Sequence, residues 1–170
     1  MIRVAGLNKN DVVNGEGVSV SLFLQGCHFH CKGCHNPEAW DPEGGDAWYE
    51  DKLIQTIIDA IAANGIQRNL SILGGEPLDT DDKREFCKQL IYKTKDKYPN
   101  IKIVIWTGYT LETLQKENNT DYILKNIDYL IDGPFILSER DITLKWRGSR
   151  NQRIIDIKKT LEKNEIILYE

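Results

Sequence analysis

The sequence predicts an α/β protein with a mostly parallel sheet, folded as an incomplete barrel of about six strands. Short apolar segments alternate with amphipathic helical segments along most of the chain, as in βαβ units. The strand-like segments are nearly all apolar, which favours a sheet covered on both faces. With 170 residues, the chain is too short for a complete barrel, which needs about 250.

The first half of the chain predicts two strands and one helix. A short strand, Ile2 to Leu7, is followed by a turn-rich loop that ends at Gly17. Val18 to Gln25 lies between glycines and predicts the second strand. Residues 36–46 contain two prolines and two glycines, so we expect irregular structure there. Glu50 to Asn64 predicts a helix, because its apolar residues recur at helical spacing.

The second half continues the alternation. The predicted strands are Asn69 to Leu73, Lys102 to Trp106, Asp128 to Ile131, Arg153 to Ile157 and Ile166 to Tyr169. The predicted helices are Thr80 to Lys97, a short helix capped by Thr110, and Lys158 to Lys163. Ligand sites in parallel sheets lie at the carboxyl ends of the strands. The most distinctive motifs of this sequence all follow such ends, which indicates one functional site.

Composition argues against several classes of function. The chain has 26 acidic and 22 basic residues, a net charge of −4 that suits nucleic-acid binding poorly. No apolar run reaches the length of a membrane span, and the first residues are too polar for a secretion signal. We therefore expect a single domain over residues 1–170, in the cytoplasm, with no nucleic-acid or membrane partner. Thiols stay reduced there, and clustered cysteines usually bind metal.

The loop at residues 26–37 carries the strongest signal. It contains three cysteines spaced Cys-x3-Cys-x2-Cys, namely Cys27, Cys31 and Cys34. Three thiolates on a short loop suit an iron–sulfur cluster or zinc. A structural zinc site needs four protein ligands, and His28 or His35 would supply the fourth, so a zinc-stabilised binding module stays open. A disulfide would leave an odd cysteine.

Three later strand ends also carry candidate ligand-binding residues. In Gly74-Gly75-Glu76-Pro77 the glycines allow a ligand to approach the backbone, and Pro77 holds Glu76 extended. The free carbonyls and the Glu76 carboxylate are acceptors for an ammonium group. Thr107 and Asp132 follow the next two strands. An ordinary turn is the alternative for each of these segments.

Two kinds of reactive residue fall outside these motifs. Cys87 lies on the inward side of its predicted helix, so we interpret it as a packed core residue. No carboxylate partner is identifiable for His28 or His30, and no acid–base pair is predicted from them.

The cysteine spacing resembles the signature of radical S-adenosylmethionine (SAM) enzymes. The run from Gln25 to Glu38 closely resembles one branch, the activating proteins of anaerobic (class III) ribonucleoside-triphosphate reductases. Gly33 stands where the wider superfamily often has an aromatic residue, and it matches this branch. Gly-Gly-Glu-Pro resembles the motif that holds the SAM amino group. The stretch Arg147 to Arg153 resembles a motif near the end of the activating proteins and is a candidate site wall or docking surface.

The resemblance implies a radical SAM core in which Cys27, Cys31 and Cys34 bind a [4Fe–4S] cluster and carry the catalysis. SAM would bind the open iron, near Gly33, Cys34, His35, Gly74, Gly75, Glu76, Thr107 and Asp132. A reduced flavodoxin or ferredoxin would donate the electron that cleaves SAM. The resulting 5′-deoxyadenosyl radical would take a hydrogen atom from a glycine of the reductase. The nearest alternatives are an activator of another glycyl-radical enzyme and a small deazapurine-type synthase.

Overall fold

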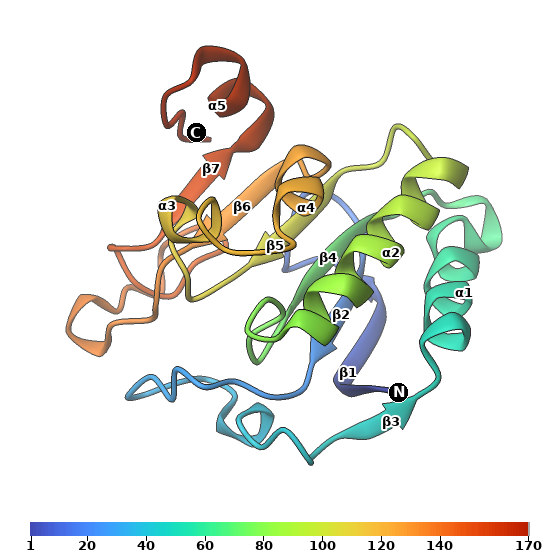
Figure 1. Ribbon diagram of the computed structural model, residues 1–170, viewed down its shortest axis with the longest axis horizontal. Helices are drawn as coiled ribbons and strands as arrows, with labels where there is room; N and C mark the ends of the chain where they lie inside the picture. The colour runs from blue at the N-terminus through green and yellow to red at the C-terminus, as the bar shows by residue number, and fades with distance from the viewer. Residues whose placement is uncertain (170) are drawn as a thin grey trace.

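The computed structural model describes residues 1–169 and builds them around a seven-stranded sheet (Figure 1). The order across the sheet is β3-β1-β2-β4-β5-β6-β7. The strands are β1 (Ile2–Asp11), β2 (Ser19–Leu24), β3 (Asp46–Trp48), β4 (Asn69–Gly74), β5 (Ile103–Trp106), β6 (Tyr129–Asp132) and β7 (Arg153–Asp156). The α-helices are α1 (Glu50–Ile61), α2 (Asp81–Lys97), α3 (Leu111–Leu114), α4 (Asp121–Lys125) and α5 (Ile157–Lys163).

The sheet has a parallel centre and antiparallel edges, which confirms the α/β class. Strands β2, β4, β5 and β6 pair in parallel. Strands β1 and β3 extend one edge in antiparallel pairing, and β7 extends the other. Because the four central strands run the same way, their carboxyl ends lie along one edge of the sheet. The sequence motifs are therefore brought to that edge.

Three segments differ from the predictions, and the first is α4, where no helix was expected. No strand was predicted at residues 46–48, and only Asp46 fell in the segment expected to be irregular; they form β3, where Ile2 pairs with Trp48. The Arg3 guanidinium donates from Nε to the Gly44 carbonyl at 2.7 Å and so holds the preceding segment against β1. The predicted last strand, residues 166–169, forms only an isolated bridge between Ile155 and Leu168.

One face of the sheet is aliphatic and packs against helices. Figure 1 shows α1, α2 and α4 on the same side of the sheet. The strand residues buried in that core include Val20, Leu22, Leu24, Leu70, Ile72, Ile103, Ile105 and Leu130. They occur at alternate positions, as the pleat of a strand requires. Burying them supplies the main driving force for forming this layer.

The opposite face is mixed: a smaller apolar cluster of Val104, Tyr129, Ile131 and Ile154 lies on it beside polar residues. It carries Ser19, Ser21 and Ser71, all buried, at positions that alternate with the aliphatic ones. The Ser71 hydroxyl donates to the Asn14 carbonyl at 2.7 Å, so the β1–β2 loop packs on this face. Loops rather than helices cover it, which leaves space for a cavity near the strand ends.

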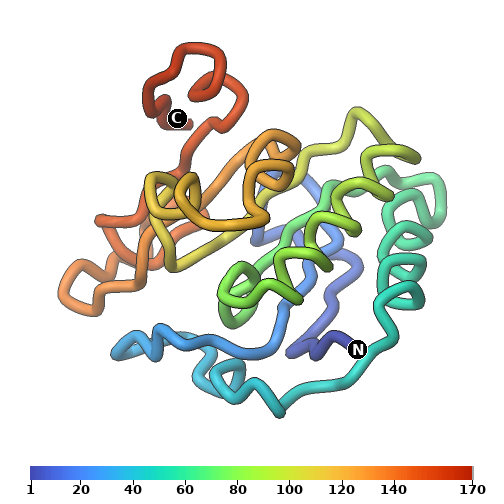
Figure 2. Tube along the Cα trace, viewed as in Figure 1, coloured from blue at the N-terminus to red at the C-terminus, as the bar shows by residue number. Residues whose placement is uncertain are grey.

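The chain trace shows how the cysteine loop is placed. In Figure 2 the chain leaves β2 and runs below the sheet before returning to β3. The N-terminus lies beside β3, and the C-terminal segment lies beyond β7 (Figure 2). Among the helices of residues 1–169, none has both the length and the apolar character needed to cross a bilayer.

Candidate metal and ligand site

A cavity of about 540 Å³ lies at the carboxyl ends of the central strands. Its lining includes most of the residues singled out in the sequence: Cys27, Cys31, Cys34, His35, Gly74, Gly75, Glu76 and Thr107. Aromatic walls are supplied by Phe29, Trp40, Trp106 and Phe135. Its volume and mixed lining suit a small-molecule site. Segments far apart in the sequence thus meet at one place.

Hydrogen bonds fix the start of the cysteine loop before the first cysteine. The Gln25 side-chain amide donates to the Glu38 and Asp41 carbonyls, at 2.7 and 2.8 Å. The Gly26 N–H donates to the Ala39 carbonyl at 2.7 Å. The outgoing and returning arms of the loop are therefore tied together. A loop held in this way presents its side chains with little freedom.

The three loop cysteines are free, half-buried and directed to the same cavity. Burial raises the pKa of the Cys27 thiol, and two backbone N–H groups of the loop partly oppose that rise. The Asn36 N–H lies 3.4 Å from Cys34 Sγ and donates to it. Such donors stabilise a thiolate. The number and softness of these donors fit an iron–sulfur cluster.

The metal-ligating side chains do not gather around a single point. Within residues 1–169, no three His, Cys, Asp or Glu side chains are arranged to bind one ion. A structural zinc site needs four ligands at about 2.0–2.3 Å from the metal. The three thiols line one cavity without forming a four-ligand site of this kind.

The Gly-Gly-Glu-Pro turn packs directly on the backbone of the cysteine loop. The Gly75 N–H donates to the Leu24 carbonyl at 2.9 Å, and the Glu76 N–H donates to the Gly26 carbonyl at 2.8 Å. A Cβ at Gly75 would overlap the Gly26 carbonyl and lie 2.8 Å from the Ala39 carbonyl oxygen. Gly74 has a φ of +124°, which favours glycine. Glycine is needed here for close backbone packing.

Glu76 is buried and its carboxylate is held by the neighbouring strand end. The Thr107 hydroxyl donates to Oε1 at 2.8 Å, and the Gly108 N–H donates to Oε2 at 2.6 Å. The Leu78 N–H donates to Oε1 at 3.0 Å. Burial raises the pKa of Glu76 to about 7, against the opposite effect of these hydrogen bonds. The carboxylate joins the ends of β4 and β5.

This raised pKa predicts how stability depends on pH. The pKa of Glu76 is above its value in the unfolded chain, so folding favours the protonated form. Its contribution to the free energy of unfolding is complete below about pH 4.5 and is lost as the pH rises through 7. Denaturant unfolding of the metal-free chain and of Glu76→Gln checks this. The wild type should lose more stability than the variant between about pH 5 and pH 8; equal losses would contradict the assignment.

Two predicted site residues lie outside the cavity lining. Gly33 adopts a φ of +78°, and a Cβ there would lie 2.8 Å from Leu137 Cδ1. The buried Asp132 carboxylate accepts from the Leu111 N–H at 2.8 Å and from Arg153 Nε at 3.0 Å. Asp132 therefore links β6 to α3 and β7.

A polar loop closes another side of the cavity. The Gln152 side chain accepts from the Gly148 N–H at 2.9 Å and donates to the Gly133 carbonyl at 3.0 Å. The Arg147 guanidinium donates to the Gln152 carbonyl at 2.8 Å. Phe135 and Trp146 also line the cavity. The sequence motif in this loop thus forms a wall of the site.

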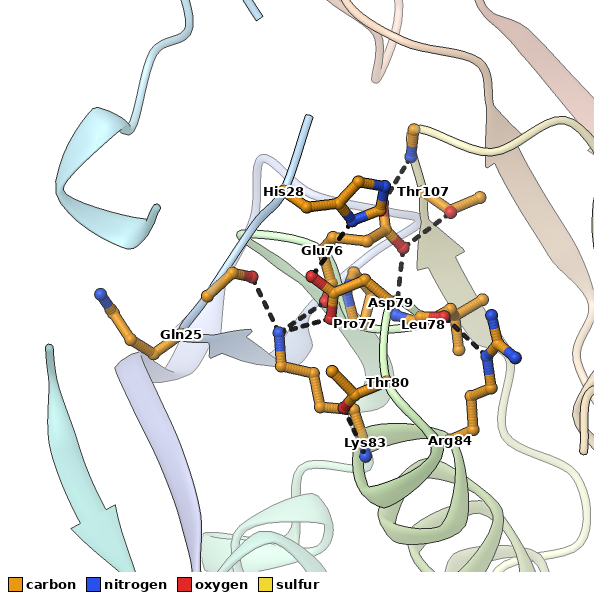
Figure 3. Close-up of polar contacts among 12 residues, drawn as sticks. Gln25, His28, Glu76, Pro77, Leu78, Asp79, Thr80, Lys83, Arg84 and Thr107 are labelled. Atoms are coloured by element: carbon orange, nitrogen blue, oxygen red, sulfur yellow. Dashed lines mark hydrogen bonds and ion pairs between the residues drawn. The ribbon is translucent and has the colours of Figure 1, made fainter. Parts of the chain in front are cut away.

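Sequence reasoning missed a charged network beneath the turn (Figure 3). Asp79, Lys83 and Arg84 are all buried there or nearly so. His28 was expected to have no carboxylate partner, but its Nδ1 lies 3.4 Å from Asp79 Oδ2. The only sequence signal was the spacing of Asp79 and Lys83, four residues apart just after the motif. Cys87 is buried in α2, as predicted.

Comparison with known proteins adds an independent finding. Residues 13–155 match the family model described as a 4Fe-4S single cluster domain. The chain is 39% identical over 145 residues to the anaerobic ribonucleoside-triphosphate reductase-activating protein of Haemophilus influenzae, an alignment that covers 85% of this chain and 91% of that protein. It is 34% identical over 146 residues to the protein of the same name from Escherichia coli K12, with 84% and 90% covered. The counterpart in Enterobacteria phage T4 is 33% identical over 146 residues, with 85% and 87% covered.

Proposed function

The chain belongs to the family of anaerobic ribonucleoside-triphosphate reductase-activating proteins, and from this premise we propose that it is a radical SAM activase. It cleaves SAM reductively and generates a glycyl radical on the anaerobic reductase. One observation carries the proposal: three free thiols and the Gly-Gly-Glu-Pro turn meet at one cavity. The thiols provide a site for a cluster, and the turn provides acceptors beside it.

Each loop cysteine has the same role in this proposal. Cys27, Cys31 and Cys34 would hold a [4Fe–4S] cluster, and with three protein ligands the cluster would keep one iron open to SAM. When bound, the cluster and SAM supply a one-electron cleavage that yields methionine and a 5′-deoxyadenosyl radical. The Asn36 N–H donates to Cys34 Sγ and helps to orient this side chain. The aromatic side chains that line the cavity reduce the access of water to it.

The turn holds the amino group of SAM. The Glu76 carbonyl already accepts from Lys83 at 2.9 Å, so the carbonyls of Gly74 and Gly75 are the better acceptors for that group. The Glu76 carboxyl group lies at the cavity wall, where an ammonium group of the ligand would favour its ionised form. Thr107 orients this carboxylate through its hydroxyl. His35 lines the cavity immediately after the third cysteine.

The two residues outside the cavity lining act on its shape. The positive φ of Gly33 allows the tight turn between the second and third cysteines. The hydrogen bonds of Asp132 to the Leu111 N–H and to Arg153 fix the end of β6, next to the cavity-lining Gly133. Both residues therefore position parts of the SAM site.

The mixed sheet serves as an incomplete barrel of the radical SAM type. Its mixed face carries the cavity, and loops rather than helices border that face. A glycine-bearing segment of a large protein substrate enters from the side that helices leave free. A reduced flavodoxin or ferredoxin in the cytoplasm supplies the electron.

Spin resonance tests the proposed function. The reconstituted protein is incubated without oxygen with SAM, a reductant and the anaerobic reductase, and the sample is frozen for electron paramagnetic resonance. A glycyl doublet on the reductase is expected only when all components are present. A doublet on a different glycyl-radical enzyme, or turnover of a free small molecule, would assign the chain to another activator or to a synthase.

A further inference from the structure

A buried ammonium group connects the cysteine loop to the Gly-Gly-Glu-Pro turn. Lys83, in the first turn of α2, points beneath the loop (Figure 3). Its Nζ donates to the Gly26 carbonyl at 2.8 Å, to the Glu76 carbonyl at 2.9 Å and to Asp79 Oδ1 at 2.8 Å. An ammonium has three N–H donors. All three are thus used by acceptors in the two segments that form the site.

The acceptors of this network lie on both sides of the first cysteine. Gly26 precedes Cys27, and its carbonyl accepts from Lys83. His28 follows Cys27, and its ring nitrogen lies 3.4 Å from Asp79 Oδ2. The Asp79 side chain is almost wholly buried and contacts Lys83 with its other oxygen. The Lys83–Asp79 pair therefore constrains both neighbours of Cys27.

Burying an ammonium group costs free energy unless each of its N–H donors has a hydrogen-bond acceptor. An apolar side chain of similar length would fill the same space. Helix α2 gains nothing from a cation in its first turn, because a positive charge there opposes the helix dipole. The two carbonyls belong to the loop and the turn rather than to α2. The buried ammonium of Lys83 is therefore best explained by its link between the cysteine loop and the Gly-Gly-Glu-Pro turn.

We propose that Lys83, supported by Asp79, is a positioning residue that fixes Cys27 relative to the Gly-Gly-Glu-Pro turn. The inference deepens the proposed function, because SAM must contact both the cluster and the turn at the same time. A change in their spacing should weaken SAM binding more than cluster binding. On a loosened loop the three thiolates could still bind a cluster, because the loop would move together with it. SAM must reach the cluster and the turn at the same time, so a larger distance between them would weaken its binding.

Lys83→Met tests the inference, with Arg84→Met as the matched control. Arg84 is the next residue of α2 and is also buried, but its Nε donates to the Leu78 carbonyl at 2.7 Å, away from the cysteine loop. We expect Lys83→Met to keep its iron and to raise the SAM dissociation constant at least about tenfold. Arg84→Met should lose thermal stability and bind SAM within about twofold of the wild type.

A second readout needs no cofactor. Alkylation of the metal-free chain, followed by mass spectrometry, reports how well each thiol is held. The rate is measured across pH, so that the limiting rate of the fully ionised thiol is compared and changes in the thiolate fraction are removed. Lys83→Met and Asp79→Asn should each raise this limiting rate for Cys27 while leaving Cys34 unchanged, and Asp79→Asn keeps the measurement possible if Lys83→Met does not fold. Unchanged Cys27 alkylation with normal SAM affinity would overturn the inference, as would equal effects in Arg84→Met. A wild type that binds neither iron nor SAM would instead overturn the proposed function.

Discussion

Replacing Cys27, Cys31 or Cys34 with alanine is expected to abolish SAM cleavage after anaerobic reconstitution with iron and sulfide. The three thiols face one cavity, and each supplies the only protein bond to its iron in the proposed cluster. A cluster that loses one of three ligands is held by two and is exposed to solvent. Iron analysis and chromatography of 5′-deoxyadenosine measure both effects. Full iron content and activity in any one variant would remove that residue from the ligand set.

Cys87→Ala is the matched control for this series. Cys87 is fully buried in α2, and burial raises the pKa of its thiol to about 12. A neutral thiol in the core is not a metal ligand. We expect normal iron content and normal SAM cleavage, with a modest loss of stability from the small space left. Cluster loss in Cys87→Ala would mean that iron binding in this protein depends on core packing as well as on the loop thiols.

The second large effect is expected from Gly75→Ala. The new Cβ would overlap the Gly26 carbonyl and lie 2.8 Å from the Ala39 carbonyl oxygen, and both contacts are backbone. Neither can move without shifting the start of the cysteine loop. A displacement of about 1 Å between reacting groups costs about a hundredfold in rate. We therefore expect SAM cleavage to fall at least about a hundredfold, as measured by initial rates at saturating SAM.

Gly65→Ala separates this effect from the general cost of replacing a glycine. Gly65 has a φ of +72°, and a Cβ there would meet no atom within 4 Å. The substitution should lower stability by about 1 kcal/mol through backbone strain and leave the rate of SAM cleavage unchanged. If Gly75→Ala behaved like Gly65→Ala, the close packing of the turn on the loop would have no role in the reaction.

Much of the site could be predicted because its signals are local. The spacing of the three cysteines and the Gly-Gly-Glu-Pro turn are read directly from neighbouring residues. The cysteine loop and the Gly-Gly-Glu-Pro turn meet at one cavity because β2, β4 and β5 are parallel, so their carboxyl ends lie at the same edge of the sheet. The position of α1 was equally clear, since its apolar spacing is strongly helical, whereas the short helix α4 was not predicted.

The features that were missed depend on tertiary contacts. Strand β3 is short, and two of its three residues, Asp46 and Ala47, have low strand propensity, so it forms through its pairing with β1. The Lys83 ammonium has its role only after folding brings Gly26, 57 positions away in sequence, next to it. The serines of the mixed sheet face resembled ordinary strand residues until the β1–β2 loop was seen to pack on them.

The most direct test of the account measures iron and 5′-deoxyadenosine in the same anaerobic preparation. The account predicts about four irons per chain, and release of 5′-deoxyadenosine when SAM and a strong reductant are added. One zinc per chain with no iron, together with SAM that stays intact under reducing conditions, would contradict it.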